Sequence, residues 1–171
     1  MRGVIYYSKS GENYVNGQLK RLEKGNTAVV AEKIAAYLDA ELIQLIPKKE
    51  YPESYQQTVE MAEREKQQQV LPEYQEIAQN IAQYEELFIG YPNWWGTFPQ
   101  VVKTFLKEQD LTGTTIYPFC THEGSALGSS VADMTMFCSK AKIETGLAIR
   151  GSKAADSDKA IANWLSHLIK N

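Results

Sequence analysis

Residues 90–99 read Gly90-Tyr91-Pro92-Asn93-Trp94-Trp95-Gly96-Thr97-Phe98-Pro99, and the apolar run Leu87-Phe88-Ile89 precedes them. A short uncharged run of bulky apolar residues is typical of a strand buried on both faces of a sheet. Pro92 cannot donate a hydrogen bond to a neighbouring strand, so the strand is expected to end there. The two tryptophans then lie on a loop at the carboxyl end of a strand. There they either stack on a flat conjugated ligand, or one plugs the edge of the sheet while the other is half exposed.

Apolar strand-like segments alternate with helical ones along the rest of the chain. Strands are expected at residues 3–7, 41–46, 87–89, 114–120 and 143–149. Helices are expected from residue 28, capped by Asn26 or Thr27, at 55–69 with a resumption through 77–81, after 101, at 131–141 and at 159–169. This alternation predicts one α/β domain, residues 1–171, with a parallel sheet covered on both faces.

Two polar segments interrupt this pattern. Asn16-Gly17 follows the first strand and predicts a small hairpin. The Glu-, Gln- and Lys-rich residues 48–83 are expected on the outside of the fold. Their tyrosines, Tyr51, Tyr55 and Tyr74, either line a binding site, form a protein contact surface or pack against the core.

Composition limits the possible functions. With 171 residues, 43% hydrophobic and 23% charged, the chain is expected to form one domain with a substantial core. A net charge of -3 argues against nucleic acid as the main partner. No apolar run is long enough to cross a bilayer, and the amino terminus lacks a signal-peptide pattern. Two cysteines and two histidines are too few for a disulfide scaffold or a metal site, so a reduced cytoplasmic protein is expected.

Three loops at the carboxyl edge of the predicted sheet have side chains suited to ligand binding. Ser8, Ser10, Asn26 and Thr27 surround a helix start, where free amides and the helix dipole attract an anion, although the same residues also serve as ordinary caps. The double tryptophan is the second loop, and residues 121–125 are the third. Together they suit a phosphorylated planar cofactor. Neither a Walker loop nor a GxGxxG fingerprint is present.

The segments 5–10, 25–27, 90–96 and 120–125 resemble the flavodoxin family. The resemblance implies a three-layer α/β/α sandwich with a five-stranded parallel sheet in the order 2-1-3-4-5, and FMN held noncovalently at its carboxyl edge. No catalytic residue and no metal ligand are assigned from the sequence. The residues matched to the FMN phosphate are Ser8, Ser10, Gly25, Asn26, Thr27 and Ala28. Those matched to the two sides of the flavin ring are Pro92, Asn93, Trp94, Trp95 and Gly96, and then Thr121, His122, Glu123, Gly124 and Ser125.

One feature departs from the family pattern. The family's phosphate loop is a compact run, whereas residues 11–24 here separate Ser10 from Gly25. We expect residues 12–23 to loop outward, so that Ser10 rejoins Gly25, and to shield the cofactor. FMN would then stay bound if a direct join replaced them. In the family, the peptide before the loop glycine can turn its carbonyl toward the flavin N5, and here that peptide joins Trp95 to Gly96.

The resemblance leaves more than one function open. The main hypothesis is an FMN electron carrier that serves redox partner proteins or a small-molecule acceptor, without nucleic acid or membrane. The alternative is an FMN-dependent NAD(P)H:quinone oxidoreductase, usually built at a homodimer interface. A flavin-free α/β binding module is the third. A receiver domain of that third class would need carboxylates where Ser8 and Tyr91-Pro92 stand.

Overall fold

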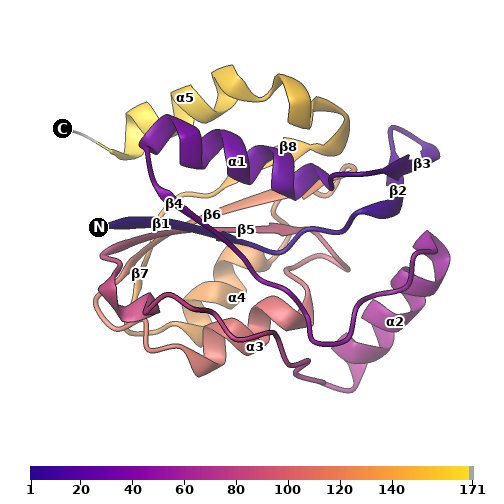
Figure 1. Ribbon diagram of the computed structural model, residues 1–171, viewed down its shortest axis with the longest axis horizontal. Helices are drawn as coiled ribbons and strands as arrows, with labels where there is room; N and C mark the ends of the chain where they lie inside the picture. The colour runs from indigo at the N-terminus through magenta and orange to yellow at the C-terminus, as the bar shows by residue number, and fades with distance from the viewer. Residues whose placement is uncertain (170–171) are drawn as a thin grey trace.

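The computed structural model describes residues 1–169 and has a parallel sheet between two helical layers (Figure 1). The sheet runs in the order β4 (Glu41–Gln44), β1 (Arg2–Tyr6), β5 (Glu86–Pro92), β6 (Thr115–His122). The last position is shared by two short strands that both pair with β6, β7 (Lys142–Ile143) and β8 (Leu147–Arg150). Counting β7 and β8 as one interrupted strand gives the order 2-1-3-4-5, which confirms the predicted fold.

Pro118 explains why the fifth strand is interrupted. On β6, the Thr115 amide donates to Glu85 beside β5, whereas the Ile116 carbonyl accepts from Glu144 on the opposite side. Alternate residues of a parallel strand face opposite neighbours, so Pro118 faces the fifth strand. It has no N–H to donate there. The ladder is broken between β7 and β8 at the level of this proline.

Four helices cover the two faces of the sheet. Figure 1 shows α1 (Asn26–Leu38) and α5 (Asp158–Leu168) on one face and α3 (Gln100–Glu108) and α4 (Ser130–Phe137) on the other. Successive residues of the central strands face opposite layers, so that Val4 and Tyr6 join the core under α1 and α5 while Ile5 and Tyr7 join the other. Among residues 1–169, no helix is both long and apolar enough to span a membrane.

The segment after residue 67 differs from the prediction. Helix α2 covers Tyr55–Gln67 and does not resume beyond Pro72; only the short 3₁₀ helices η1 (Ile81–Gln83) and η2 (Gly151–Asp156) complete the helical elements of the described chain. The reason is a long-range pairing: the Lys48 amide donates to Glu73 and the Gln75 amide donates to Ile46. These bonds hold the chain around Tyr74 extended against residues 46–48.

The predicted hairpin is present after β1. It consists of β2 (Gly11–Val15) and β3 (Gln18–Leu22), which pair antiparallel. Asn16 and Gly17 form the turn, with φ of 53° and 82°, the left-handed pair that a two-residue hairpin turn requires. Figure 1 shows the hairpin and α2 beyond the same end of the sheet, the end at which the parallel strands finish.

Candidate functional site

A pocket of about 530 Å³ lies at the carboxyl edge of the sheet, between the hairpin, α2 and the three loops. All but three of the residues expected at a binding site line it: Ser8, Asn26, Thr27, Pro92, Asn93, Trp94, Trp95, Gly96, Thr121, His122, Glu123, Gly124 and Ser125. The exceptions are Ser10, Gly25 and Ala28. The fold therefore brings three loops that are distant in sequence to one cavity.

The first loop forms the amino terminus of α1. Gly25, rather than Asn26 or Thr27, is the N-cap residue, and it has no side chain with which to cap the helix. Ser8 supplies the missing acceptor, since its Oγ accepts from the Ala28 amide at 3.0 Å. The amides of Asn26 and Thr27 have no acceptor within the described part of the chain. Two free amide donors at the positive end of a helix form a site for an anion.

Gly25 packs tightly against the end of β1. A Cβ at Gly25 would lie 2.3 Å from Ser8 Oγ and 2.4 Å from the Lys9 carbonyl oxygen. The hairpin does loop outward, as expected, but the chain closes at Ser8 and Lys9, and Ser10 is exposed. The resemblance predicts Ser10 at this junction because a hydroxyl residue directly precedes the glycine in the compact family loop. Only the path of the hairpin shows that the contact falls two residues earlier.

The second loop gives its two tryptophans different environments. Trp94 is half-buried and packs edge-on against Tyr7 and Tyr51, with ring centroids 5.4 Å and 4.9 Å away. Trp95 is 47% exposed, and its Nε1 donates to the Val59 carbonyl at 3.1 Å. Both tryptophans line the pocket, Trp94 as a packed side chain and Trp95 as an exposed one, and their stacking on a flat ligand stays a prediction.

The backbone of this loop is strained at Trp95. Trp95 and Gly96 have φ of 56° and 86°, and the bulky indole makes the first value unusual. Three contacts hold the turn in place. The Gly96 amide donates to Asn93 Oδ1 at 3.0 Å, Lys66 Nζ donates to the Trp95 carbonyl at 2.5 Å, and the Ser129 amide donates to the Gly96 carbonyl at 2.8 Å. In this structure the Trp95 carbonyl is therefore directed to α2.

Hydrogen bonds hold three polar side chains of the third loop. Thr121 Oγ1 lies 2.7 Å from Thr27 Oγ1 and joins the loop to α1. His122 Nδ1 accepts from the Gly124 amide at 3.0 Å, and burial, with Arg150 nearby, lowers the pKa of this imidazole. Glu123 Oε1 accepts from the Asn16 amide at 2.7 Å, which connects this loop to the tip of the hairpin.

Seven residues line the pocket that sequence reasoning did not assign to it. They are Lys9, Asn13, Tyr14, Tyr55, Thr58, Val59 and Ala62. Those on α2 recur at intervals of three, four and seven residues, which places them on one face of the helix. That spacing is visible in the sequence, but the sequence does not indicate that this face of the helix points toward the carboxyl edge of the sheet. Of the three tyrosines with alternative roles, Tyr55 lines the pocket. Tyr51 packs against Trp94, and Tyr74 packs against Phe105.

The described residues contain few side chains suited to nucleophilic catalysis or to metal binding. Burial raises the pKa of the Cys120 thiol to about 12, and its sulfur lies 3.2 Å from the Ala126 carbonyl. A thiol with such a pKa stays protonated and unreactive at neutral pH. Among residues 1–169, no group of three or more His, Cys, Asp or Glu side chains is placed to hold a metal ion.

Comparisons with known proteins agree with this fold. The family model described as flavodoxin matches residues 22–168. A candidate flavoprotein from Bacteroides eggerthii DSM 20697 superposes with a TM-score of 0.80 at 26% identity, over 99% of this chain and 98% of that one. A flavoprotein from Lactobacillus acidophilus NCFM, solved in complex with FMN, has a TM-score of 0.64 at 22% identity, over 92% and 97% of the two chains. A candidate quinone reductase from Klebsiella pneumoniae shares the fold at a TM-score of 0.53 and 12% identity, over 100% and 86%. No curated protein sequence matches this chain.

Proposed function

The chain belongs to the flavodoxin family, and we propose that it binds FMN noncovalently in this pocket and acts as an electron carrier. The observation that carries the proposal is the pairing of two features in one cavity. Free amides of Asn26 and Thr27 form an anion site at the start of α1, and aromatic side chains line the pocket beside it. A phosphorylated planar ligand needs both. The complex of the Lactobacillus acidophilus flavoprotein with FMN supports the same assignment.

The phosphate would lie at the amino terminus of α1. The two free amides donate hydrogen bonds there, and the hydroxyl of Thr27, which the Thr121 hydroxyl holds, adds a further donor or acceptor. No first-turn acidic residue opposes the anion. The Ser8 hydroxyl fixes the backbone of this turn through Ala28, so Ser8 acts mainly by ordering the donors.

The ring system would lie against the apolar walls of the pocket. Trp94 and Trp95 form one wall, and Tyr55, Val59 and Ala62 of α2 form another. These side chains exclude water and orient a flat ligand by stacking. Bound FMN supplies electron transfer chemistry, and the protein sets its orientation and electrostatic surroundings.

The pocket favours a carrier over a reductase. Its volume of about 530 Å³ lies in the range of a site for one small molecule, and the hairpin, α2 and the third loop border it. A reductase must place NAD(P)H and then an acceptor beside the flavin. We place the carrier in the cytoplasm, with redox partner proteins as its electron donor and acceptor.

Two assays test the proposal. The first titrates the apoprotein with FMN and with riboflavin while following flavin fluorescence. FMN should bind at least about tenfold more tightly, because only FMN offers a phosphate to the free amides. The second measures NADPH consumption with a quinone as acceptor. The loaded protein should consume almost none without a partner reductase, and rapid turnover would replace the carrier by the oxidoreductase.

A further inference from the structure

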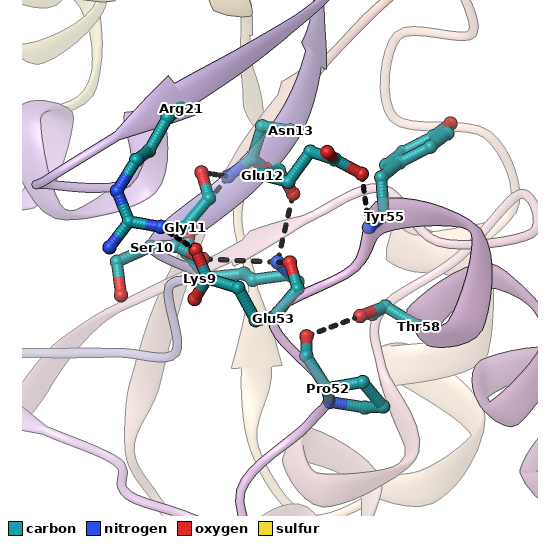
Figure 2. A network of polar contacts seen from close by, with 10 residues as sticks. All are labelled: Lys9, Ser10, Gly11, Glu12, Asn13, Arg21, Pro52, Glu53, Tyr55 and Thr58. Atoms are coloured by element: carbon teal, nitrogen blue, oxygen red, sulfur yellow. Dashed lines mark hydrogen bonds and ion pairs between the residues drawn. The ribbon is translucent and has the colours of Figure 1, made fainter.

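Lys9 lies in the loop that leads to the anion site, yet its ammonium turns away from it. Nζ donates to three main-chain carbonyls: Ser10 at 3.0 Å, Glu12 at 2.9 Å and Glu53 at 3.3 Å. Figure 2 shows the ammonium between the hairpin and the segment before α2. A lysine ammonium has three protons to donate, so these carbonyls use its full capacity. Lys9 therefore has no proton left for a phosphate.

The same junction contains further bonds between the hairpin and α2. The Glu12 carboxylate accepts from the Tyr55 amide at 3.0 Å (Figure 2). The Glu12 amide donates to the Glu53 carbonyl at 3.3 Å, and Ser54 is the N-cap of α2. Arg21 and Glu53 add an ion pair. Burial lowers the pKa of the Lys9 ammonium, whereas Glu12 raises it. The hairpin and the start of α2 form one unit, and Lys9 donates to both of its parts.

This unit brings two aromatic side chains to the pocket. Tyr14 of the hairpin stacks on Tyr55 of α2, with ring centroids 5.7 Å apart and planes 24° from parallel. Both line the cavity. The tip of the hairpin continues across to the third loop, where the Asn16 amide binds the Glu123 carboxylate. The hairpin thus closes one side of the pocket from α2 to the third loop.

We propose that Lys9 is a positioning residue that ties the hairpin to α2, and that the wall so formed retains the flavin ring system in the pocket. This inference rests on the proposed function for the identity of the ligand. This role differs from direct contact with the phosphate. A lysine beside an anion loop would ordinarily be taken as a phosphate ligand.

The two roles predict different responses to Lys9→Met. A phosphate ligand affects FMN and spares riboflavin, whereas a wall that retains the ring affects both. We expect Lys9→Met to weaken the binding of FMN and of riboflavin by the same factor, about tenfold or more. Such a factor is typical of the loss of one hydrogen bond to a charged group. Lys20→Met is the matched control, since Lys20 lies on the same hairpin, exposed and without these carbonyl contacts. Unchanged binding of both flavins, or loss of FMN alone, would overturn the proposal.

Amide hydrogen exchange of the apoprotein tests the junction without any flavin. The amides of Glu12 and Tyr55 should exchange at least about tenfold faster in Lys9→Met than in wild type, and at the wild-type rate in Lys20→Met. Unchanged exchange rates of the Glu12 and Tyr55 amides in Lys9→Met would refute the proposed role of Lys9, regardless of which flavin the protein binds. If the wild-type protein binds neither flavin, the proposed function fails. The exchange rates still show whether Lys9 holds the hairpin against α2. If Lys9→Met does not fold, Tyr14→Ala replaces it. Tyr14 is 41% exposed, and removing its side chain should weaken the binding of both flavins equally. Unchanged binding in Tyr14→Ala would refute the wall.

Discussion

Replacing Gly25 by alanine perturbs the proposed anion site at its tightest point. The backbone itself tolerates alanine, because Gly25 has φ of -64° and ψ of 155°. The obstacle is space: the new Cβ would lie 2.3 Å from Ser8 Oγ and 2.4 Å from the Lys9 carbonyl oxygen. The Ser8 hydroxyl can rotate away, but it then leaves the Ala28 amide without its acceptor. The Lys9 carbonyl belongs to the main chain, so relief requires β1 and α1 to move apart.

The cost follows from these two effects. Overpacking a tight site typically costs about 1–3 kcal/mol, and loss of a helix cap costs about 1 kcal/mol. We therefore expect Gly25→Ala to lower the free energy of unfolding of the apoprotein by about 2–4 kcal/mol. Ser8→Ala removes the cap alone and should cost about 1 kcal/mol. The double variant should recover only part of the loss, because the Lys9 carbonyl still obstructs the methyl group.

Urea unfolding of the apoproteins measures these differences, and flavin titration tests their location. Gly25→Ala displaces the free amides at the start of α1, where the phosphate is proposed to bind. The affinity for FMN should therefore fall by a larger factor than the affinity for riboflavin. Lys9→Met, by contrast, should weaken both flavins alike. A Gly25→Ala protein within about 0.5 kcal/mol of wild type would refute the tight packing at Gly25. An unchanged ratio of FMN to riboflavin affinity would refute the proposed anion site.

Three further predictions concern the pocket walls and the buried groups. Trp94→Ala should lower the free energy of unfolding by about 3 kcal/mol, because it removes the indole that packs against Tyr7 and Tyr51. Trp95→Ala should mainly weaken flavin binding. Equal losses of stability in the two variants would contradict the different environments of the two side chains. Burial raises the pKa of Glu65 above 4.5 despite its hydrogen bond from Tyr51. The folded state therefore holds this proton more tightly than the unfolded state, and the contribution to stability falls as pH rises from about 4.5 through the folded pKa. Glu65→Gln should gain stability relative to wild type across that range, and a constant difference between the two proteins would argue against it. Burial also raises the pKa of Cys120 to about 12 and of Cys138 to about 11, so iodoacetamide at about pH 8 should modify neither in the folded protein, as mass spectrometry would show.

Much of the fold could be predicted because it depends on local patterns. The buried run 87–89, the periodic helix after Asn26 and the Asn16-Gly17 turn each specify their own conformation. Their alternation then limits the topology of the sheet. Residues 68–80 are the counterexample, since their extended path depends on hydrogen bonds to residues 46–48. A helical composition there was overridden by a partner distant in sequence.

The site could be predicted only loop by loop. The three loops were recognised by their content, and the parallel sheet explains why they meet at one edge. The capping of α1 by Ser8 was missed because it joins residues on either side of the hairpin. The wall formed by Tyr14 and Tyr55 was missed for the same reason. Both depend on how the insertion folds back, which no local signal reports.

The most direct test of the account is the visible absorption spectrum of the purified, folded protein after incubation with FMN and removal of the excess. Flavin bands should remain at about one FMN per chain, since the proposed anion site lies beside a pocket lined by aromatic side chains. A folded protein with no flavin bands would contradict it. The three loops would then be caps and plugs of a flavodoxin fold that has lost its cofactor.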